Sequence, residues 1–543
     1  MLSYRKLAMR VLGRPLHTEG IDSPRPASQR AAAFALTAAM LITLAAPAFA
    51  KTWHIEDGDI TVKAGDTKGT NKVSQGESTD VPDTDTVITN REKNASSNTV
   101  TIETNDKNDK VEVTLKDVNI DTSSRNKAAV SVTGEGDTNI KLDGDTALKS
   151  DIYRSGIYGS GSGSLTISGG ENDSLTAQGG SGANGISSSG SLTISGGTVT
   201  ANGDDGGRGI SSSGSVTISG GSTVTANGGN GTISGGDGIC SNGGVTISGG
   251  STVTANGGNG GSLVGGDGIR SGGGLTVSDG TVTAKGGNGD SKDGYGGDGI
   301  RSGGVITISG NTVNAAGGYG GKVGGYGICS FDRVAISGGT VEAAGGNGST
   351  GGGSGIYSSV IDLSGSLELT AKAGSPNGKA LLQAGHELDL DTIKDKLGPG
   401  AKVTVTDADG KVNQVSIPRP VEPEEPVIPE ESSSSSDGGS ATPSTPASPL
   451  PGLTVTDKSG AVISYTSTQS GNTLTVCVGR FTASFRISLA ALRQLRAEGI
   501  ETITFQTILC STTLSVDELL AMGGEDAEAV LTHRLTDSSL TVG

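Results

Sequence analysis

The chain has 543 residues, more than one ordinary domain holds, so two or more folded units joined by linkers are expected. Glycine supplies 93 residues and aromatic residues only 3%, a composition far from globular averages and typical of a repetitive, disordered or fibrous chain. The formal net charge of −17 argues against a surface for nucleic acid or anionic lipid, because no basic cluster offsets the repulsion.

The first 50 residues have the pattern of a secretory signal peptide. Basic residues lie between Arg5 and Arg14, an apolar run extends from Ala31 to Leu44, and small residues precede a cleavage site after Ala50. The apolar run is short for a stable membrane span, and no stop-transfer segment follows it. We expect a cleaved, strongly acidic, secreted or cell-surface protein with no transmembrane helix. An uncleaved anchor is the alternative.

Strands are expected from residue 51 onward, at first with a loose period. Apolar and polar residues alternate at Thr99–Ile102, Val111–Leu115, Val118–Ile120, Ala129–Val132 and Thr138–Leu142. A regular repeat follows, in which a Gly-Ile pair begins at positions 156, 185, 209, 238, 268, 299, 327 and 355. A nearly constant period of this kind is typical of stacked structural units.

Each repeat reads as three short strands. In one repeat, Ile186, Leu192, Ile194 and Val199 fall on one face of these strands and threonines on the other. The Gly-Gly pair between strands permits positive φ, so the strands can turn about a common axis. Coils stacked about 4.8 Å apart would bury the apolar face that one coil cannot. The sequence therefore predicts an all-β fold, a right-handed parallel β-helix solenoid. An antiparallel sandwich is the competing fold.

The β-helix domain is assigned to residues 51–417, with its repeats over about 156–375. Loops rich in glycine and asparagine precede the Gly-Ile pairs, as at Gly257–Gly266 and Gly286–Gly297, and their variable length predicts binding loops on one edge. The segments expected to cap the stack are a strand at Ile361–Thr370, a short helix at Thr392–Leu397 and a strand at Val403–Thr406.

Residues 418–451 are rich in proline and serine and predict a linker without a core. Residues 452–543 then predict a small C-terminal α+β domain. Ser488 is placed to cap a helix that continues through Arg496 and that Gly499 ends, and a Ser515–Glu518 capping box begins a second helix. The expected strands are Leu453–Thr456, Leu474–Val478, Ala483–Ile487 and Thr502–Thr507.

The residue before each Gly-Ile pair forms a column along the stack, with Asp237, Asp267 and Asp298 on consecutive coils. Stacked like charges repel unless they are compensated, and oxygen ligands of this kind suit Ca²⁺. The three aspartates are therefore predicted calcium ligands. The alternative is that each carboxylate hydrogen-bonds the backbone at its corner.

Arg270 and Arg301 lie in the column that follows Gly-Ile, each three residues after an aspartate. Guanidinium groups bind carboxylates with paired hydrogen bonds, so both arginines predict binding of an acidic sugar. An exposed Asp–Arg surface ladder of little energetic value is the alternative. Tyr295, Tyr319 and Tyr326 lie in or beside the loops and are predicted to stack on sugar rings, with scattered surface tyrosines as the alternative.

The four cysteines fall into two pairs. Cys240 and Cys329 share a column but stand three coils apart, roughly 14 Å, so they are expected to be free thiols. Cys477 and Cys510 lie at the ends of predicted neighbouring strands, where they either form a disulfide or remain free.

Three features resemble a secreted bacterial carbohydrate-binding family: Val111–Ile120, Ala129–Leu142, and Asp-Gly-Ile turns followed by Leu-Thr-Ile-Ser-Gly-Gly-x-Val-Thr-Ala. The resemblance covers about residues 95–417. It implies a parallel β-helix similar in shape to pectate lyases, associated with cellulose and acidic plant polysaccharides and with bound calcium. The tail, at residues 492–503, resembles a module that recurs in surface proteins of gut Firmicutes.

The sequence thus predicts a monomeric, non-catalytic polysaccharide-binding protein, assisted by calcium, for plant-type or acidic glycans. One alternative is a pectate-type polysaccharide lyase, which needs clustered carboxylates and a base. Its candidate residues are Asp267, Asp298, Arg270 and Arg301. A structural surface spacer or adhesin without a ligand is the other alternative.

Overall fold

The computed structural model describes residues 50–310 and 312–418 and, in the C-terminal part, 452–457, 462–463, 465–470, 472–478, 482–507, 511–522, 527–534 and 537–542. The chain divides into two compact units, Met1–Pro423 and Glu424–Gly543, and the division falls within the predicted linker. The predicted signal peptide and linker lie outside the described residues, apart from Ala50 and Pro418. Within the described ranges, no helix is long and apolar enough to cross a lipid bilayer.

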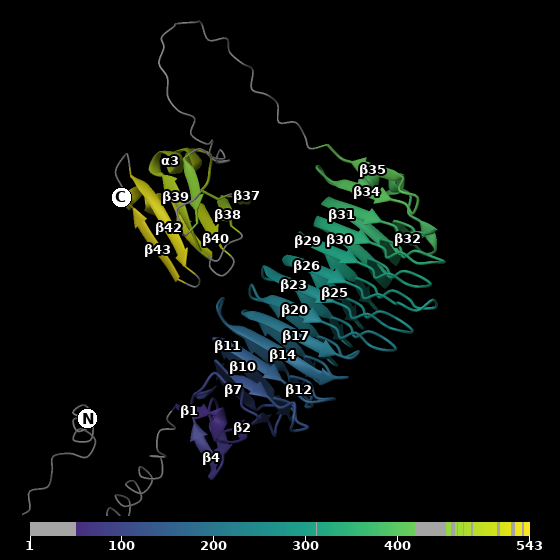
Figure 1. Cartoon of the computed structure of the whole chain (residues 1–543). Helices are drawn as coiled ribbons and strands as arrows, with labels where there is room; N and C mark the ends of the chain where they lie inside the picture. The colour runs from purple at the N-terminus through teal and green to yellow at the C-terminus, as the bar shows by residue number, and fades with distance from the viewer. Residues whose placement is uncertain are drawn as a thin grey trace, which may run out of the picture. The chain divides into compact units, whose positions relative to one another are not determined.

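The first unit is a parallel β-solenoid of about 13 turns (Figure 1). Each coil contributes strands to three parallel ladders, and equivalent residues pair from coil to coil. Ile186, for example, pairs with Ile157 on the coil before it and with Ile210 on the coil after it. The predicted parallel β-helix and its repeat register are therefore confirmed.

The first ladder contains the Gly-Ile strands and runs through β2 (Ile60–Ala64), β6 (Val100–Glu103), β9 (Val130–Thr133), β12 (Ile157–Gly159), β15 (Ile186–Ser188), β18 (Ile210–Ser212), β21 (Ile239–Ser241), β24 (Ile269–Ser271), β27 (Ile300–Ser302), the starts of β30 (Ile328–Ala344) and β31 (Ile356–Lys372), and β32 (Leu381–Gln383). The second runs through β1 (Lys51–His54), β5 (Thr86–Thr89), β7 (Lys110–Lys116), β10 (Asp137–Asp143), β13 (Leu165–Ser168), β16 (Leu192–Ser195), β19 (Val216–Ser219), β22 (Val245–Ile247), β25 (Leu275–Val277), β28 (Ile306–Ile308) and the middles of β30 and β31. The third runs through β8 (Asn119–Asp121), β11 (Asp145–Lys149), β14 (Ser174–Ser181), β17 (Thr198–Asp204), β20 (Thr223–Asn227), β23 (Ser251–Asn256), β26 (Gly280–Lys285), β29 (Thr312–Ala316), the ends of β30 and β31, and β34 (Lys402–Thr406).

The inward-facing side chains of the three ladders form one continuous apolar core. Ile186, Leu192, Ile194 and Val199 are all fully buried, as their alternation with polar residues predicts. Burying a side chain of this size stabilises the fold by roughly 1.5–3 kcal/mol, and each coil repeats the contribution. The corner between the second and third ladders depends on glycine, because Gly197 has a φ of 72° that other residues rarely adopt.

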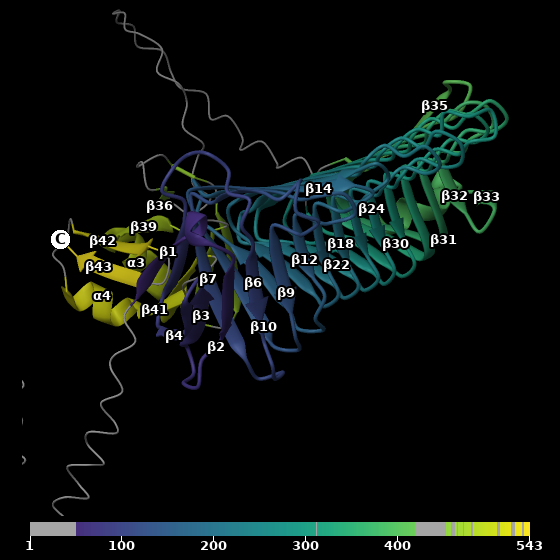
Figure 2. The same ribbon diagram turned by 60° about the horizontal axis from the view of Figure 1, so that its bottom comes forward.

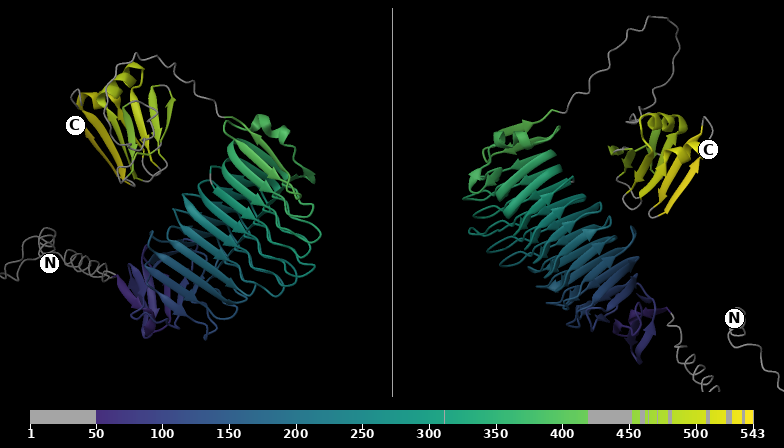
Figure 3. Two further views of the ribbon diagram at one scale, coloured as in Figure 1. Left: turned by 45° about the horizontal axis from the view of Figure 1, so that its top comes forward. Right: turned by 180° about the vertical axis from the view of Figure 1, so that it is seen from behind.

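The loops that connect the third ladder to the first form a second stacked layer, which we call the glycine fin (residues 228–237, 257–267, 286–298, 317–326 and 345–354). Figures 2 and 3 show these loops following one another along one edge of the solenoid. In each loop, an outgoing arm leaves the third ladder and a returning arm leads to the next Gly-Ile pair. The loops vary in length, as the sequence shows, and their arms stack in register; their role in binding stays a prediction.

Backbone hydrogen bonds between glycines hold the fin together. Gly258 donates its N–H to the carbonyl of Gly236, Gly266 to Gly258, Gly287 to Gly266 and Gly297 to Gly287, at 2.8 to 2.9 Å. The bonds therefore zigzag between outgoing and returning arms. The close approach requires glycine, because a Cβ atom at Gly287 would lie 1.9 Å from the carbonyl oxygen of Gly258.

Short elements close both ends of the solenoid. At the N-terminal end, β3 (Asn71–Gln75) and β4 (Ser78–Asp83) pair antiparallel beside β2, next to the 3-10 helix η1 (Ile55–Asp57). At the C-terminal end lie the 3-10 helix η2 (Leu390–Lys396), β33 (His386–Glu387) and β35 (Val412–Ser416), which pairs antiparallel with β34. The predicted C-terminal cap is thus present, with a 3-10 helix at the predicted helical segment.

The described residues of the second unit form two four-stranded sheets and two helices that share an apolar core. Helix α3 (Leu489–Ala497) begins at Ser488, whose hydroxyl accepts the N–H of Ala491 at 3.2 Å, and Gly499 follows it with a φ of 91°. Helix α4 is Val516–Met522. The strands are β36 (Leu453–Thr456), β37 (Thr466–Ser470), β38 (Thr473–Cys477), β39 (Thr482–Ser488), β40 (Thr502–Gln506), β41 (Ser511–Ser515), β42 (Glu528–Arg534) and β43 (Asp537–Val542).

Four strands and both helices of this unit match the prediction, while β37, β41, β42 and β43 were missed. Cys477 is a free thiol whose Sγ lies 3.6 Å from Oε1 of Gln506, and Cys510, its alternative disulfide partner, lies outside the described residues.

We expect Gly318→Ala to destabilise the fin, because its Cβ would lie 1.9 Å from the carbonyl oxygen of Gly287. Amide hydrogen exchange in residues 286–326 should accelerate, reflecting a local loss of roughly 2 kcal/mol or more. Gly338→Ala is the matched control, since its Cβ would meet its nearest neighbour, the nitrogen of Gly310, at 3.4 Å. Equal exchange rates in the two variants would contradict the close packing of the arms.

Candidate functional site

The predicted aspartate column lies where the returning arms of the fin meet the first ladder. Gly238 donates its N–H to the carbonyl of Asp267 at 2.9 Å, and Gly268 donates to that of Asp298 at 2.8 Å. Asp237, Asp267 and Asp298 therefore lie on consecutive coils, as the repeat alignment predicted.

Each aspartate hydrogen-bonds the coil that follows it. The N–H of Asp267 donates to Oδ1 of Asp237 at 2.9 Å, that of Asp298 to Oδ1 of Asp267 at 2.8 Å, and that of Tyr326 to Oδ1 of Asp298 at 2.7 Å. The three aspartates are only 4% to 5% exposed. The alternative prediction, that each carboxylate hydrogen-bonds the backbone, is thus correct. The N–H that each carboxylate accepts, however, belongs to the next coil and not to the corner of its own coil.

Three arginines face the second oxygen of these carboxylates. The closest nitrogen-to-Oδ2 distances are 3.1 Å from Arg208 to Asp237, 3.8 Å and 3.5 Å from Arg270 to Asp237 and Asp267, and 3.3 Å from Arg301 to Asp298. The arginine side chains are 36% to 45% exposed, whereas the aspartate side chains are 5% to 7% exposed. The arrangement is therefore a ladder of half-buried ion pairs, in which the carboxylates are buried and the guanidinium groups are partly exposed. These are not ordinary surface ion pairs.

Burial governs the protonation of this ladder. Desolvation, together with the neighbouring carboxylates of Asp298 and Asp237, raises the pKa of Asp267 to about 7 against the attraction of Arg270. Desolvation likewise raises the pKa of Asp298 to about 6, against its hydrogen bond from Tyr326. Both carboxylates consequently titrate near neutral pH.

A neutral version of the same ladder exists elsewhere in the fin. On the outgoing arms, the N–H of Asn259 donates to Oδ1 of Asn230 at 2.7 Å, that of Asn288 to Asn259 at 2.8 Å, and that of Tyr319 to Asn288 at 2.9 Å. Asparagine therefore suffices for this coil-to-coil bond. The coil-to-coil bond therefore does not require the negative charge of the aspartate column, which lies next to the arginines.

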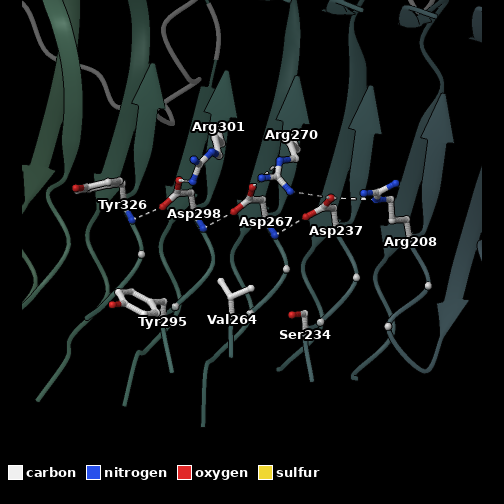
Figure 4. Close-up of a pocket in the computed structure, with 18 of the residues that line it drawn as sticks. Arg208, Ser234, Asp237, Val264, Asp267, Arg270, Tyr295, Asp298, Arg301 and Tyr326 are labelled. Carbon is white, nitrogen blue, oxygen red and sulfur yellow. Dashed lines mark hydrogen bonds and ion pairs between the residues drawn. The ribbon is translucent and has the colours of Figure 1, made fainter. Parts of the chain in front are cut away.

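A groove of about 690 Å³ follows the ladder (Figure 4). One side carries the arginines, the aspartates and Tyr326, and the other carries side chains of the returning arms, namely Ser234, Val264, Tyr295 and Val323. Glycine backbone separates the two rows. The lining extends over six coils, from that of Asn184 to that of Tyr326, which at roughly 4.8 Å per coil gives a length of about 24 Å.

The groove brings together most of the residues that the sequence singled out. Arg270, Arg301, Tyr295 and Tyr326 all line it, together with the three aspartates, whereas Tyr319 is not among its lining residues. The ring of Tyr326 stacks on that of Tyr357, with centroids 5.1 Å apart, and Lys322 lies over the ring of Tyr295 at 5.7 Å.

Sequence reasoning missed Arg208, Val264 and Val323. Arg208 stands in the same column as the aspartates, next to Asp237, so its charge was a usable signal. Val264 and Val323 belong to fin arms of unequal length, whose alignment required the structure.

The aspartates do not fit a calcium site. Calcium takes six to eight oxygen ligands, but here one oxygen of each carboxylate accepts a backbone N–H and the other faces a guanidinium group. Among the described residues, no group of three or more His, Cys, Asp or Glu side chains is arranged to hold a metal ion. Calcium binding at Asp237, Asp267 and Asp298 stays a prediction that this geometry does not favour.

Cys240 and Cys329 flank the arginines in their column, since Cys240 pairs with Arg270 and Cys329 with Arg301. Both are buried free thiols, as predicted. Burial raises the pKa of Cys240 to about 11 and that of Cys329 to about 12, so neither is a reactive thiolate at neutral pH.

Comparisons of the chain with protein families, curated proteins and solved structures found no match.

We expect Asp267→Asn to stabilise the protein at high pH. The ordinary aspartate pKa is 3.8 and the folded value is about 7, so the ionised carboxylate opposes folding above that pH and stability rises as pH falls. Asparagine keeps the acceptor without the charge. At about pH 8 the free energy of unfolding should rise by on the order of 1–2 kcal/mol, and at about pH 4 it should change little.

Thermal and denaturant unfolding at both pH values check this expectation, with the exposed Asp293→Asn as control. A loss of stability at high pH in Asp267→Asn would mean that the ion pair with Arg270 outweighs the cost of burial.

Proposed function

We propose that this chain is a secreted or cell-surface protein that binds a polysaccharide along the groove of its solenoid and does not cleave it. The row of arginines carries the proposal. Arg208, Arg270 and Arg301 keep 36% to 45% of their side chains exposed beside a continuous groove. Guanidinium groups arranged in this way suit the carboxylates of an acidic glycan.

The form of the groove favours an extended ligand over a small one. It crosses six coils, and three consecutive coils present an aspartate in the same column, so a linear chain of repeating units matches it better than a compact molecule. Val264, Tyr295 and Val323 supply an apolar opposite wall, against which the carbon-bound hydrogens of sugar rings can pack. The signal-peptide pattern supports an encounter with polysaccharide outside the cell.

The same residues favour binding over cleavage. A lyase needs a free base poised beside the substrate, but the carboxylates of Asp267 and Asp298 are buried and held by backbone N–H groups. Arg270 and Arg301 are ion-paired with these carboxylates. The carboxylates are therefore placed to fix the arginines beside the groove and not to act as a base.

We expect an Arg270→Gln, Arg301→Gln double variant to lose at least about tenfold in affinity for polygalacturonate fragments, since it removes two of the three guanidinium contacts. Arg333→Gln, an exposed arginine that pairs with Asp362 at 3.9 Å, is the matched control and should bind as the unmodified protein does. Isothermal titration calorimetry gives the affinities. Equal binding by the two variants would remove the arginines from the site.

A glycan array, with and without calcium, identifies the ligand class, and retention of acidic glycans is the expected result. Failure to retain any polysaccharide would overturn the proposal and leave a structural spacer. Incubation with polygalacturonate should produce no absorbance of unsaturated products. Steady product formation abolished by a chelator would instead establish a lyase.

A further inference from the structure

The aspartate column costs stability that an asparagine column would not. The asparagines of the outgoing arms make the same coil-to-coil hydrogen bond without charge, and burying a carboxylate is unfavourable unless it is compensated. The compensation comes from Arg208, Arg270 and Arg301, which all remain partly exposed to the groove. The pairing therefore serves to keep arginines at the groove before a ligand arrives.

We infer that the three aspartates are stand-in counterions, which the carboxylates of a bound glycan replace on Arg208, Arg270 and Arg301 while protons bind to Asp267 and Asp298. This inference rests on the proposed function and narrows its substrate class. The ligand is a glycan with carboxylates repeated along its chain, and neutral glycans such as cellulose fragments bind weakly.

The contacts permit the exchange. The distances from Arg270 and Arg301 to their carboxylates are 3.3 to 3.8 Å, beyond the roughly 2.7–2.9 Å of strong charge-assisted hydrogen bonds. The guanidinium groups therefore retain capacity for a second partner. The aspartates cannot follow the arginines toward the groove, because Oδ1 of each is held by the N–H of the next coil.

An aspartate that loses its arginine is left buried beside its neighbours. Binding a proton is then the favourable outcome, because it removes an unpaired charge from a site that is largely shielded from water. The surrounding ionisable groups reinforce this direction, since two of them are carboxylates on adjacent coils and the thiols beside them stay neutral. Asp267 interacts with the charged or ionisable groups of Asp237, Asp298, Arg270, Arg301 and Cys329. Cys240 lies beside Arg270 in the neighbouring column, and Tyr326 and Tyr295 line the same groove.

The exchange predicts the direction of pH dependence. When the aspartates are ionised, three carboxylates balance three guanidinium groups and the groove has little net charge. When Asp267 and Asp298 are protonated, which their raised pKa values of about 7 and about 6 allow near neutral pH, the groove becomes positive. A polyanionic glycan should thus bind more tightly as pH falls, although the chain as a whole is acidic.

Calorimetry with oligogalacturonate tests the inference on the full chain. At about pH 7.5, titrations in two buffers of different ionisation enthalpy should reveal net proton uptake on binding. Affinity should rise between about pH 8 and about pH 5.5, by up to about tenfold per pH unit for each proton taken up. A cellulose oligosaccharide serves as the neutral probe and should bind weakly at every pH.

The decisive variant is Asp267→Asn with Asp298→Asn, which keeps both ladder acceptors and removes both titrating groups. It should bind oligogalacturonate more tightly at about pH 7.5, without proton uptake and with little dependence on pH. Asp293→Asn removes an exposed carboxylate of the fin and should retain the pH dependence of the unmodified protein. Hydrogen exchange of the fin verifies that the variants are folded.

The outcomes separate the two proposals. Binding without proton uptake, or an unchanged pH dependence in the double variant, would overturn the exchange and leave polysaccharide binding intact. Equal affinity for the neutral and acidic probes would overturn the carboxylate requirement. Absence of binding to either probe would overturn the proposed function and the exchange together.

Discussion

In-register stacking of parallel coils is the constraint from which the other features follow. Ile186 pairs with Ile157 and Ile210 on the adjacent coils, and this register places every other position of the coil near its equivalents, about 4.8 Å away along the axis. Repetition therefore has a different consequence at each position. Stacked inward isoleucines form a core, and stacked asparagines form a hydrogen-bonded ladder. Stacked like charges repel one another and need counterions.

The aspartate column shows how that liability is resolved. One carboxylate oxygen satisfies a backbone donor of the next coil, as an asparagine does in the fin, and the other holds a guanidinium group at the groove. Arg270 reaches two aspartates at once, which joins the charges of neighbouring coils into one network. A ligand that carries its own carboxylates can therefore compete for groups that are already in position.

The glycine fin supplies the second wall of this groove. Its arms lie so close that no side chain fits between them, as the 1.9 Å approach at Gly287 shows, and backbone hydrogen bonds replace an apolar core as the source of cohesion. Side chains such as Val264 and Tyr295 are consequently confined to the surfaces of the fin. The abundance of glycine is thus a packing requirement, and loop flexibility does not account for it.

The amino-acid sequence alone specifies the solenoid, the order of its three strands, and the columns to which Asp237, Cys240 and Arg270 belong. It could do so because a period repeated eight times leaves only one alignment that keeps the isoleucines inside. It also predicted both helices of the C-terminal unit from their caps, but not β37, whose polar text Thr-Ser-Thr-Gln-Ser lacks apolar alternation.

The contacts that the columns make depend on the three-dimensional path of the chain. The alignment could not tell that the aspartate oxygens point to the next coil and to the arginines, because side-chain direction depends on the path of the backbone at the corner. The alignment could not predict which arms of the fin pair, because glycine has no side chain and so leaves no apolar or polar pattern. The groove, its apolar wall at Val264 and the part played by Arg208 arise from that pairing, which is long-range and absent from any single repeat.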